Sequence, residues 1–230
     1  MKDDVNEWNK VFAQDTYYSG FFKFGMVGVH KLMEKGIPKN KKFKKVLELG
    51  GFYGNHHEYL KNHFEEYYKT DLLYEKKTHE IVDGSKIYYE YLDATKVQKL
   101  NQKFDRVIST CLIVHLENPK KILQDWRSVV TSGGYITIWV QLEQSFLLTF
   151  IQKYFSKPKF KKLGYNFDEI INTNHIHYPR RIDYFINDVF KNDSIKKYMY
   201  PFRFLPWFLN TTAVYQIKLS LEFILFLIIY

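Results

Sequence analysis

The chain has 230 residues, of which 46% are hydrophobic and 19% are aromatic. This composition supports one large domain with a buried core and excludes an intrinsically disordered chain. The formal net charge of +9 is compatible with nucleic acid, anionic lipid or an anionic substrate as the partner. A single cysteine excludes an internal disulfide framework and is typical of a reducing compartment.

The two ends of the chain differ in hydrophobicity. No apolar stretch follows Met1-Lys2-Asp3-Asp4, so we expect no signal peptide. The segment Leu219–Tyr230 is strongly apolar, but it is shorter than the roughly 20 residues that a transmembrane helix needs. It predicts either a buried terminal strand or a tail that dips into a membrane.

The basic residues are most concentrated between Lys39 and Lys45. Runs of this kind usually form a solvated surface, and Lys and Asn are abundant throughout the chain. We therefore interpret the run as an exposed loop, with an RNA-binding patch as the alternative. Residues 1–40 carry scattered aromatic side chains up to Gly36-Ile37-Pro38, and we interpret them as an N-terminal helical cover.

A glycine-rich turn follows the first apolar strand. The strand is predicted over Val46–Leu49, the turn runs from Gly50 to Gly54, and a helix is predicted over Asn55–Phe64 with its first residue as the N-cap. Glycines at such a turn let the backbone approach a ligand closely. The acid Glu48 lies near the strand end, where it suits a ligand with a cationic or hydroxyl-rich end.

Strands and helices alternate through the next part of the chain. The predicted strands are rich in β-branched and aromatic residues: Tyr67–Thr70, Lys86–Leu92, Phe104–Thr110 and Tyr135–Val140. A helix is predicted over Pro119–Val130. Parallel strands joined by crossover helices bind ligands outside their carboxyl ends. Four residues are predicted to meet at that edge: Glu48, Asp71, Asp93 and Thr110.

The last third of the chain is predicted to complete the same domain. Residues 141–185 are predicted to be helix and loop on the substrate side, and Lys197–Phe204 and Ala213–Leu219 to form an antiparallel pair. We expect one domain over 1–230. Its predicted parts are a helical cover (1–40), a cofactor-binding core (41–140), a helical insertion (141–195) and terminal strands with an apolar tail (196–230).

The glycine turn resembles the first motif of the class I methyltransferases, which use S-adenosyl-L-methionine. In that family an acid and one further residue precede Gly-x-Gly-x-Gly. Glu48, Gly50 and Gly54 match this motif, whereas Phe52 replaces the middle glycine and Gly51 precedes it. The departure places the bend of the backbone at the first two glycines.

The resemblance extends over roughly residues 46–140. Phe104–Thr110 with His115–Pro119 resembles the fourth motif of the family, and Val129–Ile138 resembles the stretch that enters its fifth strand. The resemblance implies an α/β, Rossmann-like fold. Its sheet would have seven mostly parallel strands, helices on both faces and a C-terminal antiparallel hairpin. The implied cofactor is S-adenosyl-L-methionine.

The resemblance also implies which residues bind the cofactor. They are Glu48, Gly50, Gly51, Gly54, Asp71, Asp93, Ala94 and Thr110. Asp71 can accept hydrogen bonds from both ribose hydroxyls. Asp93 stands where the family has an acid that accepts from the adenine amino group, and a helix cap for Thr95 onward is the alternative.

On the acceptor side, His115 is the candidate general base, with anchoring of the following helix as the alternative. His175 and His177 are candidates for the acceptor pocket. A metal site at these two histidines would need a third ligand, and no residue lies at a recognisable spacing from them. We therefore expect no metal site. Enzymes that methylate C5 of cytosine use a cysteine nucleophile that follows a proline. Cys111 follows Thr110 instead, and we interpret it as a small packing residue. Thr110-Cys111-Leu112 also replaces the Asn/Asp-Pro-Pro-Tyr element that is typical of amino methylation.

The segment Gly164–Leu219 resembles a bacterial subgroup encoded among surface-polysaccharide genes, through Asn174–Tyr178, Tyr200-Pro201-Phe202 and Tyr215-Gln216-Ile217. This implies methyl transfer to a small molecule, with a saccharide or lipid-linked glycan as the specific candidate. The alternatives are a non-catalytic binding protein, an RNA methyltransferase and an NAD-dependent oxidoreductase, whose glycine pattern Phe52 breaks. We expect a cytoplasmic protein without a nucleic-acid partner, and a peripheral contact with an anionic membrane is an alternative.

Overall fold

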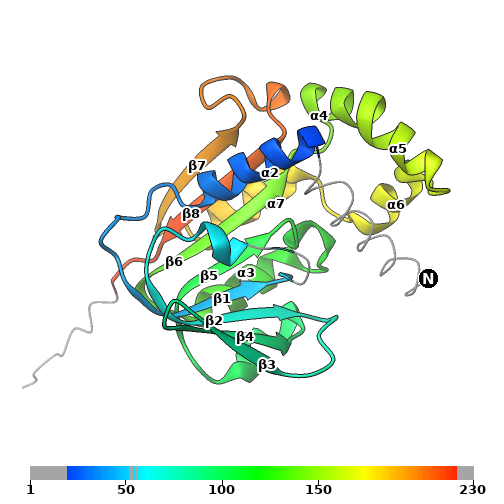
Figure 1. Cartoon of the computed structure of the whole chain (residues 1–230). Coiled ribbons are helices and arrows are strands. Elements are labelled where there is room, and N and C mark those ends of the chain that lie inside the picture. The colour runs from blue at the N-terminus through cyan, green and yellow to red at the C-terminus, as the bar shows by residue number, and fades with distance from the viewer. Residues whose placement is uncertain (1–19, 52–53, 55, 222–230) are drawn as a thin grey trace, which may run out of the picture.

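A single mixed sheet of eight strands organises the computed structural model, which describes residues 20–51, 54 and 56–221 (Figure 1). The strand order is β3-β4-β2-β1-β5-β6-β8-β7. The strands are β1 (Phe43–Leu49), β2 (Phe64–Asp71), β3 (Thr78–Val82), β4 (Ser85–Tyr91), β5 (Phe104–Thr110), β6 (Val130–Gln141), β7 (Ser194–Tyr200) and β8 (Thr212–Lys218). The pairs among β4, β2, β1, β5 and β6 are parallel, and β3, β7 and β8 are antiparallel to their neighbours.

The sheet has one strand more than the seven predicted. The additional strand β3 pairs with β4 at the edge, and Val82 and Ser85 face each other across a two-residue turn. Asp83 and Gly84 have φ values of +49° and +79°. Such positive values fit a tight hairpin turn, for which Asp-Gly is a strong sequence signal. The predicted C-terminal antiparallel pair is present as β7 and β8.

The predicted helix Asn55–Phe64 is wrong. Over the described residues 56–64 the structure has only a short 3-10 turn, η2 (His56–Tyr59), and β2 already begins at Phe64. Tertiary contacts explain the difference, because the Asn62 amide donates to the carbonyls of Pro38 and Lys41, both at 2.8 Å. These bonds hold the chain against the loop before β1 in an extended form. Asn55, the expected N-cap, lies outside the described residues.

Helices cover both faces of the sheet, as predicted. α2 (Gly20–Met33) lies on one face, and α3 (Pro119–Ser128) and α7 (Pro179–Val189) lie on the other (Figure 1). The structure thus describes only the later part of the expected cover over 1–40, and residues 1–19 lie outside it. The expected apolar tail falls largely on residues 222–230, which also lie outside it.

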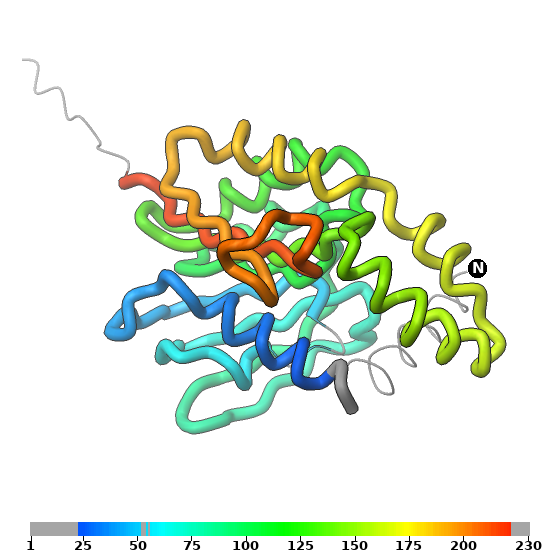
Figure 2. Tube along the Cα trace, turned by 90° about the horizontal axis from the view of Figure 1, so that it is seen from above, coloured from blue at the N-terminus to red at the C-terminus, as the bar shows by residue number. Residues whose placement is uncertain are grey.

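Helices follow β6 in the segment 141–195, which we expected to be a helical insertion, but α7 of that segment packs on the sheet through buried Ile182 and Ile186. An arm precedes α7. It consists of α4 (Phe146–Ile151), η5 (Gln152–Ser156), α5 (Lys157–Lys162) and α6 (Phe167–Asn174). Seen from above, this arm extends to one side of the sheet (Figure 2). Three further short helices, η3 (Ala94–Leu100), η4 (Ile113–His115) and η6 (Trp207–Leu209), lie in the connections.

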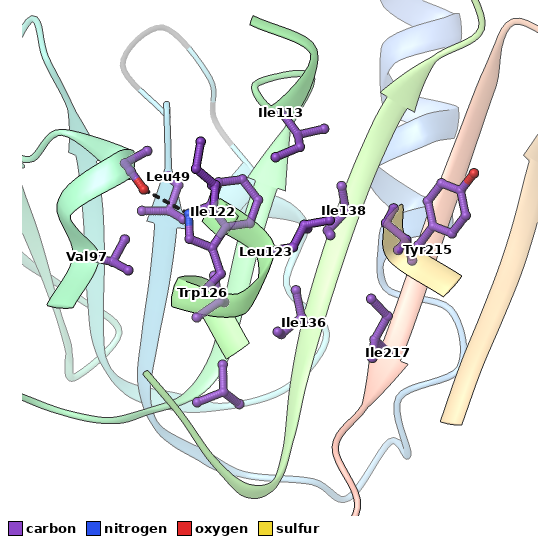
Figure 3. Packing of buried hydrophobic residues seen from close by; sticks show 14 of the residues in the cluster. Leu49, Val97, Ile113, Ile122, Leu123, Trp126, Ile136, Ile138, Tyr215 and Ile217 are labelled. Atoms are coloured by element: carbon purple, nitrogen blue, oxygen red, sulfur yellow. Dashed lines mark hydrogen bonds between the residues drawn. The ribbon is translucent and has the colours of Figure 1, made fainter. Parts of the chain in front are cut away.

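The main core lies between the sheet and the α3–α7 layer. Trp126 and Leu123 of α3 are fully buried against Ile136 and Ile138 of β6 (Figure 3). The Trp126 indole donates to the Ala94 carbonyl at 2.9 Å, which joins α3 to η3. A buried Trp contributes a large apolar area, and the hydrogen bond of its N–H fixes the orientation of the ring. The core therefore fixes the carboxyl ends of β4 and β5 relative to each other.

Candidate active site

The turn after β1 is packed closely against Glu48. Gly50 has a φ of +72°, a left-handed conformation that favours glycine, and a Cβ on Gly51 would lie 2.7 Å from the Glu48 carboxyl carbon. The Gly50 and Gly51 amides donate to the Thr70 carbonyl at 2.9 and 3.0 Å. Gly54 follows with its amide 3.0 Å from the Gly51 carbonyl. A side chain at either of the first two glycines would therefore displace the turn.

Glu48 is fully buried, and only one of its two oxygens is bonded within the described part of the chain. Tyr67 donates to Oε2 at 2.8 Å, whereas Oε1 is buried and has no hydrogen-bond partner among the described residues. Burial and the Glu48 carboxylate raise the pKa of Tyr67 well above its ordinary value, so the phenol remains a donor. An unpaired carboxylate oxygen calls for a further donor. Glu48 therefore fits a cationic or hydroxyl-bearing ligand.

Asp71 lies at the carboxyl end of β2, where the sequence predicts it. It pairs with Tyr91 of β4, and its Oδ1 accepts from the Leu73 amide at 3.0 Å. Lys69 precedes it by two residues on the same strand and is buried. Burial lowers the pKa of Lys69, and the charges of Glu48 and other nearby carboxylates oppose this shift. Asp71 and Glu48 thus both lie close enough to the buried Lys69 for their charges to favour its protonated form.

Asp93 follows β4 and caps η3. Its Oδ1 accepts from the Thr95 amide at 2.9 Å and from the Thr95 hydroxyl at 2.6 Å, and Oδ2 pairs with Lys96 at 2.9 Å. Partial burial opposes the charged form, but the bonds from Thr95 and Lys96 lower the pKa of Asp93. The capping alternative is therefore present in the structure. Ala94, next to it, is buried beneath Trp126.

Thr110 ends β5 and is half-buried beside Trp139 of β6. Cys111 follows with a φ of +54°, and its amide donates to the Trp139 carbonyl at 3.0 Å. Burial raises the pKa of the Cys111 thiol to about 12. A thiol with this pKa is protonated near neutral pH, which fits a packing role and not that of a nucleophile.

His115 lies in the connection after β5, beside the helical insertion. Its Nδ1 bonds to the Asn174 carbonyl at 2.9 Å, and its ring packs edge-on against His175, with the ring centroids 4.4 Å apart. Burial and the neighbouring His175 lower the pKa of His115 to about 4. The imidazole is therefore neutral near neutral pH. A ring that donates through Nδ1 keeps a lone pair on Nε2.

The structure brings the three candidate histidines together. The Ile176 and His177 amides donate to the Val114 carbonyl at 3.1 and 3.2 Å, which docks the α6–α7 connection onto η4. His177 also bonds through Nε2 to the Leu116 carbonyl at 3.1 Å. His175 is in close contact with Glu143, which follows β6. Sequence reasoning missed Glu143, because no pattern links it to a histidine 32 positions later.

A groove of about 890 Å³ opens next to this histidine cluster. Glu143 lines it together with Arg180 and Trp207, and the Arg180 guanidinium lies 4.7 Å from the centre of the Trp207 indole. Asp183 also lines the groove and accepts from Tyr215 and from Lys197, both at 2.7 Å. The groove therefore offers an aromatic surface, a cation without an acidic partner among the described residues, and a fixed carboxylate.

Two kinds of site are absent from the described part of the chain. No group of His, Cys, Asp and Glu side chains there is arranged to hold a metal ion. No helix there is both long and apolar enough to cross a membrane.

Comparisons with known proteins identify the fold. A family model described as a methyltransferase domain matches residues 47–138. Two solved structures align over most of both chains. A S-adenosylmethionine-dependent methyltransferase from Clostridium acetobutylicum ATCC 824 has a TM-score of 0.58 and 14% identity, over 94% of this chain and 99% of the other. The N-methyltransferase NodS from Bradyrhizobium japonicum WM9, in complex with S-adenosyl-L-homocysteine, has a TM-score of 0.57 and 9% identity, over 93% of this chain and 96% of the other.

A third structure is longer than this chain. An O-methyltransferase family protein from Burkholderia thailandensis has a TM-score of 0.54 and 10% identity, over 94% of this chain and 60% of the other. No curated protein matches the chain in sequence. At these identities the likeness establishes the fold. The chain thus has the fold of the S-adenosylmethionine-dependent methyltransferases, and the methyltransferase domain model covers its central strands.

Proposed function

We propose that the protein transfers a methyl group from S-adenosyl-L-methionine to a small-molecule acceptor, with a saccharide or lipid-linked glycan as the specific candidate. The observation that carries the proposal is the buried Glu48 oxygen that has no partner among the described residues, beneath a glycine turn on the matched strand. A cationic amino group is a suitable partner for it. Asp71, at the carboxyl end of the neighbouring strand β2, would accept from the ribose hydroxyls.

The remaining proposed cofactor residues lie at or after the carboxyl ends of β1, β4 and β5. Gly50, Gly51 and Gly54 would let the backbone approach the methionine end, and Asp93 with Ala94 would lie near the adenine. Bound S-adenosylmethionine would supply a methyl group already activated on a sulfonium. The protein then has to align the acceptor and exclude water. Thr110, at the carboxyl end of β5, would contact the cofactor from the other neighbour of β1.

His115 is the proposed general base. As the acceptor oxygen bonds to the methyl carbon and the carbon–sulfur bond breaks, its hydroxyl proton would pass to His115 Nε2. A base with a pKa of about 4 is weak for a hydroxyl acceptor in isolation. Glu143, in contact with His175, would favour a positive charge in the histidine pair once the proton arrives. Glu143 is thereby a positioning residue, and His175 and His177 would border the acceptor.

The groove supports an acceptor that is a saccharide. Trp207 presents an aromatic face, and Asp183 can accept from sugar hydroxyls. Arg180 would pair with a phosphate or carboxylate carried by the acceptor. Glu143 belongs both to the groove and to the histidine cluster, so one acceptor can reach the two.

Calorimetry with S-adenosylmethionine, S-adenosylhomocysteine and NAD tests the cofactor. We expect the first two to bind, and Asp71→Ala to weaken them by about 100-fold or more, because two charge-assisted hydrogen bonds are lost. Asp71→Asn keeps an acceptor for the Leu73 amide and so separates ligand binding from the local turn. Asp188→Ala, near the carboxyl end of α7 where it pairs with Lys120, is the control. Unchanged affinity in both Asp71 variants would remove the ribose role, and binding of NAD alone would favour an oxidoreductase.

A radiolabelled methyl donor tests catalysis against nucleotide sugars and lipid-linked glycans. His115→Gln should lower turnover far more than cofactor affinity, and Glu143→Gln should do so to a smaller extent. Cofactor binding without transfer to any acceptor would favour the binding-protein alternative. Transfer to RNA, with strongly salt-dependent binding, would favour the RNA methyltransferase.

A further inference from the structure

Large apolar side chains are exposed on two segments of the molecule. On the arm α4–η5–α5 and the residue after it they are Phe146 (67% exposed), Phe150 (48%), Tyr154 (55%), Phe155 (48%) and Leu163 (45%). On the β7–β8 loop they are Phe202 (48%), Phe204 (96%), Leu205 (43%) and Phe208 (44%). Single exposed apolar residues are ordinary, but a cluster of this kind marks a surface that binds something.

The two segments form one face at the carboxyl edge of the sheet. α4 packs against η6 of the β7–β8 loop, and both lie at the top of the molecule in Figure 1. Gln141, at the carboxyl end of β6, pairs with Thr212, where the loop re-enters the sheet. Trp207 of the same loop lines the groove. The apolar face therefore borders the candidate acceptor site.

The charges of this face have one sign. Residues 146–163 contain five lysines and residues 201–211 contain one arginine, and neither stretch contains an Asp or Glu. Among the lysines, Lys161 and Lys162 are exposed at the end of α5. Lys157 pairs with Asp168 of α6 at 2.7 Å. Aromatic side chains mixed with cations and free of carboxylates are the composition of a protein surface that lies in the headgroup region of anionic lipids.

We propose that the face formed by α4–α5 and the β7–β8 loop docks onto the surface of an anionic lipid bilayer. Its aromatic side chains enter the boundary between headgroups and acyl chains, and its lysines pair with lipid phosphates. The composition does not fit a protein partner, because protein interfaces are depleted in lysine. The inference rests on exposure and charge alone and does not depend on the identity of the methyl acceptor.

Vesicle flotation tests the proposal with the full chain. Vesicles of phosphatidylcholine are compared with vesicles that also contain phosphatidylglycerol, at low and high salt. We expect binding to the mixed vesicles that weakens as salt rises, and much weaker binding to phosphatidylcholine alone. Excess inorganic phosphate distinguishes a bilayer from a simple phosphate site, and it should displace the protein no more than chloride at the same ionic strength.

Four variants locate the binding face. The pair Phe204→Ser/Phe208→Ser and the pair Lys161→Glu/Lys162→Glu should each weaken vesicle binding by at least about tenfold. Two matched controls lie away from the face. Ile81→Ser removes an apolar side chain of β3 that is 72% exposed, between the values for Phe204 and Phe208, and Lys39→Glu/Lys42→Glu reverses two exposed lysines before β1. Both controls should bind as the parent chain does.

Circular dichroism melts establish that each variant is folded, which is expected because every substituted side chain is exposed. Absence of vesicle binding by the parent chain would overturn the proposal. So would equal weakening by the control pair, which would show a general charge effect. Self-association in sedimentation that is abolished by the Phe204 pair, without vesicle binding, would assign the face to a second copy of the chain. Loss of vesicle binding with intact S-adenosylmethionine binding would leave the proposed function untouched.

Discussion

The two faces of the sheet are held by different forces. The face under α3 and α7 is apolar, and Trp126 is its largest fully buried side chain. The face under α2 has an apolar cluster of its own, which includes Met33 and Val46, and in addition a buried polar network. There Arg106 of β5 donates to both oxygens of Glu34 at 3.0 and 2.7 Å, and His56 bonds to the same carboxylate at 3.0 Å.

This difference matters for how each face can fail. Apolar packing is spread over many side chains, so the loss of one part costs a limited amount. A buried ion pair concentrates the effect, because removal of one partner leaves the other charged and desolvated. The polar network also joins α2, η2 and β5, elements that are far apart in the sequence, and so fixes the position of α2 above the sheet.

The largest expected effect comes from breaking this ion pair. Glu34→Gln leaves the Arg106 guanidinium buried without its counter-charge, and we expect a loss of about 3–5 kcal/mol in the free energy of unfolding. Urea unfolding at neutral pH measures it. Glu65→Gln, on the exposed side of β2, is the matched control and should change stability by less than about 0.5 kcal/mol. A similar loss in both variants would contradict the distinction between the faces.

The second prediction concerns acid. Burial, followed by the charge of His56, lowers the pKa of His30 from 6.5 to about 3. Between these values the unfolded chain binds a proton that the folded chain does not, so stability falls as the pH falls. His30 alone should remove about 2 kcal/mol between pH 6.5 and about pH 5. The low pKa of Glu34, caused by Arg106 and His56 against the opposing effect of burial, acts in the same direction.

Unfolding measured at a series of pH values checks this expectation. His30→Gln has no proton to take up at this position, and its stability should depend less steeply on pH over the same range. An unchanged slope would show that His30 is not the titrating group. The apolar face contains few titratable groups, so variants there should shift the whole curve without changing its slope.

The sequence predicts the central strands well and the polar face poorly. β5 has the predicted bounds, because its β-branched run needs only local preference and burial. The missing helix after Gly54 could not be foreseen, since Asn62 and His56 bond to residues more than 20 positions away. The same holds for the candidate site. Strand ends place Glu48 and Asp71 from the sequence alone, whereas the contact of Glu143 with His175 needs the insertion to be folded.

A smaller effect is expected on the apolar face. Trp126→Phe keeps most of the ring but removes the donor to the buried Ala94 carbonyl, and we expect a loss of about 1–3 kcal/mol in the free energy of unfolding. Urea unfolding at neutral pH measures this too. Trp207→Phe on η6 is the matched control, since that indole is only half-buried, and it should lose less than about 0.5 kcal/mol. Equal losses would mean that burial of the indole N–H contributes nothing.

The smallest effect concerns Asp93, which caps η3 and is also the proposed acceptor for the adenine amino group. Asp93→Ala removes the acceptor of the Thr95 amide and should cost about 1 kcal/mol in the free energy of unfolding. Asp93→Ser restores a capping oxygen but not the carboxylate, so its stability should return to nearly that of the parent. If Asp93 also accepts from the adenine amino group, the Kd for S-adenosylmethionine rises in both variants. An unchanged Kd in Asp93→Ser would leave capping as the role of this residue, because the only group then missing is the carboxylate.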